Sequence, residues 1–324
     1  MSAQTEEVAA GPAPRIGKGG APPPRPRKRL ADGVPYLLIL PAAAVTVLLL
    51  GWTLVKNGLL SFQNLNPRQL IQHVTEWSGV DNYSEQLGSS EFWGVTARSV
   101  VFTAANVALI MVLGCLIGLL LARLGTKLRL MLSLSLVLAW AMPVVAATTV
   151  FQWLFDQRFG VVNYLLDTLG WHAMAGYSWT GGQFSTFFVI TVLIVWQSVP
   201  FVAINLYAAT TTIPKELYEA ASLDGAGPWK RFTSVTYPFL KPFFLATTFL
   251  EVIWIFKAFT QVFAINEGGP DRLTETLPVY AFQEGVGSQH FGMGAAISIL
   301  TIVILLALTA HYLRLVLKQE EDEL

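Results

Sequence analysis

"EAASLDGAGPWKR", Glu219–Arg231, lies between two long apolar runs of the sequence. The segment is too polar to enter lipid, but its alanines and spaced charges are typical of an ordered element rather than of a simple connector. Whether this segment rests on a membrane or binds another protein therefore decides which membrane fold the chain adopts and what it does.

The residues around this segment predict a short helix outside the membrane. Pro214 suits the first turn of a helix, and Glu216 lies where the helix dipole favours an acid. Apolar residues recur at helical spacing until Gly225 ends the pattern, and Pro228 can begin a second short helix. We expect a helix of about three turns within residues 213–227.

Composition places the chain in a membrane. Of its 324 residues, 53% are hydrophobic and 13% are charged, and the mean hydropathy is +0.53, which exceeds what a soluble core of this size needs. The formal net charge is zero, so the total charge does not favour a nucleic acid partner. The single cysteine, Cys115, argues against a disulfide framework and a cysteine-based metal site, and the scattered histidines suggest no metal site either.

Six apolar runs reach the length needed to cross a bilayer, about 20 residues per helix. We expect all of them to be α-helices, because lipid offers no partner for the backbone of an open strand. The predicted fold class is an all-α membrane protein with about six transmembrane helices, and Pro238 is expected to interrupt the chain before the fifth. The runs are Val34–Lys56, Val95–Arg123, Leu130–Phe155, Phe184–Tyr207, Phe239–Phe263 and Gly294–Leu317.

Cations are unevenly distributed along the chain. If the N-terminus is inside the cell, 15 of the 21 lysines and arginines lie in the tail, the inner loops and the C-terminal end, which is the bias expected of cytoplasmic segments. Both termini of this multi-pass cell-membrane protein are therefore predicted to be cytoplasmic. Residues 1–33, rich in Pro, Gly and Arg, are predicted to form a disordered basic tail, and residues 34–324 the transmembrane domain.

The short extramembrane helix has two explanations. It can rest on lipid, but a face built from Ala and Ser gives little membrane affinity. It can instead enter a groove on a cytoplasmic protein, where small residues permit close approach and Glu219 offers a charge for pairing. The second explanation fits the composition better.

"EAASLDGAG", followed by "YP", resembles the cytoplasmic loop of the permease subunits of ABC importers. The flanking "WQSVPFVAINLYAATTTIPKELYEAASLDGA" and "FKAFTQVFAINEGGPDRLTETLPVYAFQEG" are similar to the carbohydrate-uptake, maltose-permease-like branch. The resemblance covers Val34 to Leu317 and implies the type I ABC importer permease fold, although Tyr237 stands where the pattern usually has Leu. It assigns the coupling to a cytoplasmic ATPase to Glu219, Ala220, Ala221, Asp224 and Gly225.

The resemblance also implies the partners of the chain. These would be a second permease subunit that completes a heterodimeric pore, two ATPase subunits and an extracytoplasmic solute-binding protein, with membrane lipid around the spans. The chain itself would have no catalytic residue and no cofactor, because ATP and magnesium would be bound by the partner ATPase. The solute would be a sugar or oligosaccharide, and the alternative is another solute such as a polyol or glycerol phosphate.

A solute crosses near the middle of the bilayer, so polar and aromatic residues within the spans are candidates for its pathway. Aromatic rings stack on sugars while amides and acids bind hydroxyl groups; alternatively, the amides only join helices to one another. Glu251 is the strongest candidate, because a carboxylate in a span is costly unless it faces a polar cavity or a partner, and Lys257 lies on another side of the same helix. The candidates are Gln152, Trp196, Gln197, Asn205, Glu251, Trp254, Lys257 and Gln261.

Other classes of function lack their signatures. No Gly-rich phosphate loop with a following Lys and Ser or Thr is present, which argues against an ATPase, and no nucleophile elbow or paired metal-binding histidines indicate an enzyme. An ion-coupled secondary transporter should have paired, interrupted spans in two halves, and neither is evident. A structural membrane protein would not need a hinged helix between two spans.

Overall fold

The computed structural model describes residues 34–321, and the tail predicted for residues 1–33 lies outside them. Within this range five helices are long and apolar enough to cross a membrane, or up to six if one bent pair counts as a single span. The described residues contain no strand beyond an isolated bridge between Gln63 and Trp77. The predicted all-α membrane fold is therefore confirmed. Contacts divide the chain into two units, residues 1–53 and 54–324.

The described part of the first unit is an apolar helix. It comprises α1 (Val34–Thr46), a π-helical turn (Val47–Gly51) and the beginning of α2 (Trp52–Leu60), whose residues from 54 onward belong to the second unit. Residues 36–60 have a mean hydropathy of 2.3 over the most apolar window, which agrees with the first predicted span.

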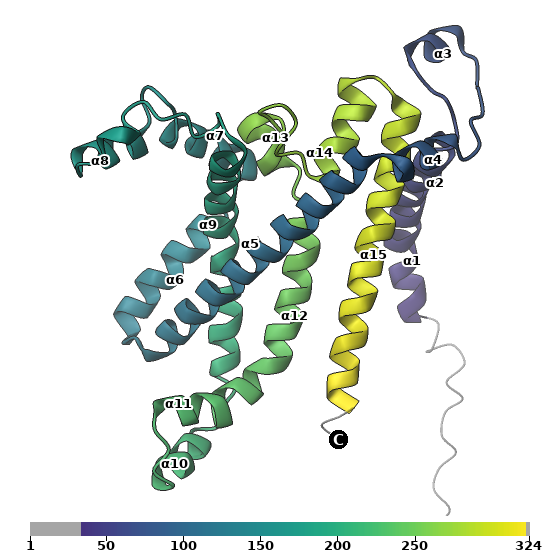
Figure 1. The fold of residues 1–324 in the computed structure, drawn as a ribbon. Coiled ribbons are helices and arrows are strands. Elements are labelled where there is room, and N and C mark those ends of the chain that lie inside the picture. Colours follow the sequence, from purple (N-terminus) through teal and green to yellow (C-terminus); the bar gives the residue numbers. More distant parts are fainter. Residues whose placement is uncertain (1–33, 322–324) are drawn as a thin grey trace, which may run out of the picture. The chain divides into compact units, whose positions relative to one another are not determined.

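The second unit contains the remaining helices (Figure 1). The long helix α5 crosses α9 and α12 obliquely, and α10 and α11 lie at the opposite end of α9 from α7 and α13. In chain order the helices are α3 (Pro67–Gln72), α4 (Asp81–Gly88), α5 (Ser90–Arg123), α6 (Thr126–Trp140), α7 (Val144–Leu154), α8 (Val161–Thr168), α9 (Gln183–Thr210), α10 (Lys215–Leu223), α11 (Pro228–Arg231), α12 (Tyr237–Phe256), α13 (Thr260–Asn266), α14 (Leu277–Phe282) and α15 (Phe291–Glu321).

Two glycines bring α5 and α9 into backbone contact. A Cβ atom added at Gly114 would lie 2.5 Å from Cγ1 of Val202, and one added at Gly118 would lie 2.9 Å from the carbonyl oxygen of Ala203. Small residues four positions apart allow this approach in membrane helices, where packing rather than hydrophobic burial joins the helices. The α5–α9 pair is therefore the centre of the second unit.

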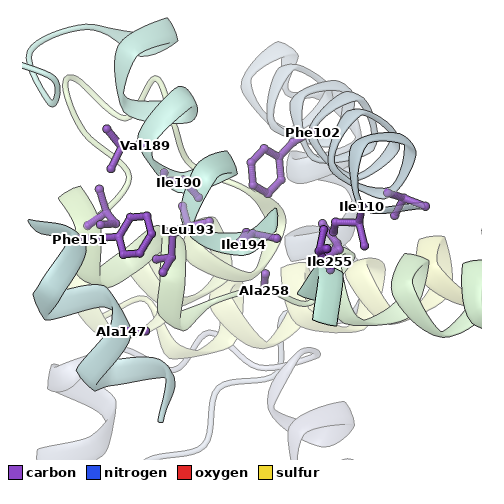
Figure 2. Packing of buried hydrophobic residues seen from close by; sticks show 14 of the residues in the cluster. Phe102, Ile110, Ala147, Phe151, Val189, Ile190, Leu193, Ile194, Ile255 and Ala258 are labelled. Atoms are coloured by element: carbon purple, nitrogen blue, oxygen red, sulfur yellow. The ribbon is translucent and has the colours of Figure 1, made fainter. Parts of the chain in front are cut away.

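The main apolar core surrounds α9 (Figure 2). Side chains of α9, among them Ile190, Leu193 and Ile194, pack in one cluster with residues of α5, α7 and α12, and all three are almost fully buried. This core includes Phe151 of α7 and Ile255 near the end of α12. The core therefore packs against α7 and against the end of α12, the two helices that lie next to interruptions of the helical chain.

The third predicted span is wrong as a single helix. Instead of one run over 130–155, α6 and α7 are bent by 96° at residues 141–143. Pro143 has no N–H for the helix ladder and disfavours helical geometry at Met142, so the helix stops and restarts. The fifth predicted span is confirmed within the candidate span Pro228–Asn266, although its helical pattern is interrupted at residues 257–259, between the end of α12 and the start of α13.

Pro238 does not interrupt the chain as predicted. Helical structure runs from Pro228 through a π-helical turn (Phe232–Thr236) into α12, with Pro238 in the first turn of α12. The wider π turn leaves room for a ring that cannot donate a backbone hydrogen bond. The bend between α6 and α7 also means that the absence of interrupted spans cannot be used to separate this chain from secondary transporters.

Candidate functional site

The helix α10 ends in a hydrogen-bonded cap built around Gly225. Asp224 follows the nine-residue helix, and Gly225 then adopts a φ of +71°. The N–H of Gly225 donates to the carbonyl of Ser222 at 3.1 Å, and the N–H of Ala226 donates to that of Ala221 at 2.9 Å, which together form a Schellman cap. The predicted helix end is confirmed. The helix is shorter than predicted, because Pro214 precedes it and a separate helix follows.

Side-chain contacts fix α10 to the helices that follow it. The hydroxyls of Tyr218 and Thr236 share a hydrogen bond of 3.0 Å, and Nη1 of Arg231 donates to Oγ of Ser222 at 3.3 Å. Ile213, just before α10, is buried. A displacement of α10 is therefore carried to α11 and the start of α12 by contacts as well as by the chain. Sequence reasoning missed Tyr218, Ser222 and Arg231; only the four-residue spacing of Tyr218 and Ser222 places these two on one face.

The residues assigned to ATPase coupling lie at the surface of α10 and its cap. Glu219, Ala220, Asp224 and Gly225 are exposed, and Ala221 is half-buried. Two large apolar side chains are exposed beside them, Leu223 at 90% and Trp229 at 76%. Small, acidic and large apolar side chains on one short ordered element are the chemistry of a helix that enters a groove on another protein.

The structure brings two pathway candidates together where the helices break. Nε2 of Gln261 in α13 donates to Oε1 of Gln197 in α9 at 3.4 Å, and Nε2 of Gln197 donates to the carbonyl of Met142 at 3.3 Å. Met142 lies in the bend between α6 and α7, where the backbone carbonyls lack helical partners. The two amides thus join both broken helices to α9, and unwound backbone in a membrane is tolerated where polar groups of the protein satisfy it.

A row of aromatic rings lies on α6, α9 and α12. The rings of Trp254 in α12 and Phe201 in α9 have centroids 5.0 Å apart, and Phe201 stacks on Trp140 of α6 at 6.1 Å. Trp140 is 48% exposed and Trp254 is 37% exposed. Trp254 was predicted from sequence, whereas Trp140 and Phe201 were missed, because the contact between their rings joins different helices and no spacing within one apolar run indicates it.

Glu251 and Lys257 differ in burial: the first is buried in the bundle and the second is exposed. Glu251 is fully buried in α12, and its carboxyl group interacts with Ser198 of α9, although neither carboxyl oxygen has a hydrogen bond of normal geometry among the described residues. Lys257 is exposed at the break after α12. The two side chains do not pair, as their spacing predicts. The role of Glu251 in the pathway stays a prediction.

The other candidates contact the helices around them. Gln152 donates its side-chain amide to the carbonyl of Ala264 and so joins α7 to α13, while Asn205 donates to a carbonyl within α9 at 2.9 Å. The ring of Trp196 lies 5.7 Å from that of Phe151. These contacts fit the alternative in which polar and aromatic residues hold the bundle together.

An ion cluster that the sequence did not predict lies at the end of the unit opposite α10. The guanidinium of Arg272 contacts Glu275 at 2.9 Å, Glu284 at 2.8 Å and Glu91 of α5 at 3.5 Å. Burial acts to lower the pKa of Arg272, but its hydrogen bonds to Glu275 and Glu284 outweigh this and raise it above the ordinary value. Burial raises the pKa of Glu275, an effect that Arg272 partly offsets, and burial raises the pKa of Tyr280 to about 12. The cluster fixes the loop after α13 to α5.

We expect Arg272→Gln to destabilise this loop. Glu275 is 1% exposed, and the substitution removes the cation that is hydrogen-bonded to its carboxylate and leaves only the more distant Arg98, at a cost of roughly 2 kcal/mol after allowing for the partial exposure of Arg272. Thermal melting of the purified protein, with limited proteolysis of residues 267–276, measures the change. Arg158→Gln is the matched control, because Arg158 is exposed and forms no ion pair among the described residues. Equal melting temperatures of the two variants would contradict the expectation.

Comparisons with known proteins place the chain in a family. Residues 110–319 match the family described as "Binding-protein-dependent transport system inner membrane component". The chain is 71% identical to the diacetylchitobiose uptake system permease protein DasB of Streptomyces coelicolor, with all of both chains covered. It is 32% identical to the trehalose/maltose transport system permease protein MalF of Thermococcus litoralis, over 86% of this chain and 92% of that protein.

A solved structure agrees with this assignment. A chain of a bacterial ABC transporter involved in the import of the acidic polysaccharide alginate superimposes with a TM-score of 0.76 at 18% identity, over 88% of this chain and 96% of that one. The predicted ABC importer permease fold is thereby confirmed, and so is the prediction of a transport subunit rather than an enzyme. The chain belongs to the family of inner-membrane components of binding-protein-dependent transport systems.

Proposed function

We propose that this chain is a permease subunit of an ATP-driven sugar importer and that its solute is diacetylchitobiose or a close analogue. The observation that carries the proposal is the 71% identity, over the whole length of both chains, to a permease named for diacetylchitobiose uptake. The relative named for trehalose and maltose supports a sugar more generally.

The residues of the spans suit a disaccharide with acetamido groups. The partly exposed rings of Trp254 and Trp140 offer faces for the apolar sides of pyranose rings. The amides of Gln197 and Gln261 can donate to an acetamido carbonyl and accept from sugar hydroxyls. The tryptophan pair and the glutamine pair belong to helices that meet at the breaks after α6 and α12. The solute pathway therefore runs beside α9.

The rest of the importer follows from the same proposal. A second permease subunit completes the pore, two ATPase subunits bind ATP and magnesium, and an external solute-binding protein delivers the sugar. The surface of α10, with Glu219, Ala220, Ala221, Asp224 and Gly225, is the docking element for one ATPase. Both termini and α10 are on the cytoplasmic side, as the cation distribution favours, and the Arg272 loop faces the binding protein.

Uptake of labelled diacetylchitobiose tests the sugar assignment. Cells without this chain should take up the label at background rate, and expression of the full chain should restore uptake. Unlabelled diacetylchitobiose should inhibit the restored uptake by competition, whereas glycerol phosphate should not. Undiminished uptake in cells without the chain, or competition by glycerol phosphate instead, would contradict the proposal.

Two tryptophan variants locate the pathway in the same assay. Trp254→Ala removes a stacking surface worth about 1 kcal/mol and should raise KM by about fivefold. Trp171→Ala, at an exposed tryptophan between α8 and α9, should leave KM unchanged.

A further inference from the structure

A cavity at the α10 end of the second unit is lined by cations. Its volume is about 700 Å³, and it lies between the end of α5, the start of α6, the end of α9 and the α10–α11 region. None of the residues that line it is acidic. The cations are Arg123, Arg129, Lys215 and Arg231.

One of these cations is built into the wall of the cavity. Nε and Nη2 of Arg129 donate to the carbonyls of Leu121, in the last turn of α5, and Leu124, which follows it, and Nη1 donates to the hydroxyl of Tyr207 at 3.2 Å. The guanidinium also lies 5.5 Å from the centre of the Tyr207 ring. All of these partners are uncharged, so the positive charge of Arg129 is fixed at the cavity without being neutralised.

The other cations have free hydrogen-bonding capacity. Nε of Arg231 is buried and has no hydrogen-bond partner among the described residues, although Nη1 of the same group bonds Ser222. No ion pair within the described part of the chain involves Arg123, Lys215 or Arg231. Because like charges around one cavity repel each other, an anion bound between them would stabilise the arrangement.

The position of the cavity indicates the class of anion. It lies at the ends of the apolar helices α5 and α9, where lipid headgroups lie in a membrane, and its wall also includes Leu119, Ile213 and Phe232. Guanidinium groups bind phosphate with paired, charge-assisted hydrogen bonds. Basic pockets between membrane helices at the cytoplasmic side bind phosphate-bearing headgroups.

We propose that this cavity binds a phosphate-bearing anion, supplied by the headgroup of an anionic phospholipid or by a free phosphate. Arg129 holds the wall in place, and Arg231 and Lys215 are the principal ligands. Because Lys215 belongs to α10 and Arg231 to α11, an occupied site ties the docking element to the ends of α5 and α9.

Thermal melting of the purified complex containing the full chain tests the site. The probes are dihexanoyl phosphatidylglycerol, dihexanoyl phosphatidylcholine and inorganic phosphate, each titrated separately. The double variant Lys215→Gln/Arg231→Gln removes two ligands, and the control Lys127→Gln/Lys230→Gln removes two exposed cations of the same region that do not line the cavity. We expect the anionic probe to bind the ligand variant at least about tenfold more weakly, and the control like the natural protein.

The outcomes separate the two sources and the alternatives. Stabilisation by phosphatidylglycerol alone supports a lipid headgroup, and stabilisation by inorganic phosphate as well supports a free phosphate. Either conclusion requires that the stabilisation is lost in the ligand variant and kept in the control variant. Equal loss in both double variants, or no stabilisation by either anionic probe, overturns the site. Loss of the ATPase subunits from the ligand variant with unchanged probe binding also overturns it and points to a protein occupant. If the double variant does not assemble, native mass spectrometry of Arg231→Gln counts the retained anionic lipids, and an unchanged count overturns the proposal.

Discussion

Gly225→Trp is expected to reduce ATP-driven uptake to the level of cells without the chain, with normal membrane insertion. Gly225 has a φ of +71°, where a side chain costs about 1–2 kcal/mol, and an added Cβ meets no atom within 4 Å. The indole therefore fits the isolated chain but occupies the surface through which α10 docks. A loss of about 3 kcal/mol in docking free energy lowers the affinity for the ATPase roughly 100-fold.

Co-purification of the ATPase subunits and sugar uptake measure this effect. Gly170→Trp is the matched control, because Gly170 also has a positive φ, +95°, and also has open space at its Cβ position. It lies in the loop after α8, at the other end of the unit. Gly225→Asn is a second control, since asparagine tolerates the left-handed conformation and is small. Normal uptake by Gly225→Trp, or the same loss in Gly170→Trp, would count against the coupling role.

Glu251→Met is expected to stabilise the protein and to abolish most of its transport. Both carboxyl oxygens of Glu251 are buried without a hydrogen bond of normal geometry among the described residues, Ser198 being a weak partner, and an unsatisfied group of this kind costs about 1–3 kcal/mol. Methionine fills a similar volume without that cost. If this cost is offset by a role in transport, as stability–activity trade-offs predict, removing the carboxylate should raise the melting temperature and lower the uptake rate about tenfold or more.

The structural alternative gives the opposite result. If Glu251 only joins helices, Glu251→Met should lower the melting temperature and leave the uptake of correctly assembled protein unchanged. Thr247→Val, one turn earlier in α12 and also buried, is the matched control, and it should change neither quantity appreciably. Measurement of melting temperature and initial uptake rate on the same preparations separates the two explanations.

Much of the fold could be predicted because local chemistry dictates it. Lipid requires long apolar helices, so the positions of the spans follow from hydropathy alone. The end of α10 follows from Gly225 and the start of α11 from Pro228, since both residues act through their own backbone geometry. Such features depend on residues within one turn of each other.

The features that were missed depend on contacts across the bundle. The break between α12 and α13 contains Lys257, Ala258 and Phe259, none of which disrupts a helix by itself, so it follows from packing rather than from local preference. The ion cluster joins Arg272 to Glu91, which is far away in the sequence. The cationic cavity is likewise lined by residues from five helices, including Arg123 and Arg231, and no spacing in the sequence predicts it.

The close approach at Gly114 and Gly118 has a mechanical consequence. With backbone against backbone, α5 and α9 cannot slide past each other without a collision at Val202 or Ala203, so we expect the two helices to move as a single rigid body. Bending is then confined to the short non-helical joints at residues 141–143 and 257–259, on either side of α9. These joints, rather than the long helices, are where a pore built from this chain would pivot.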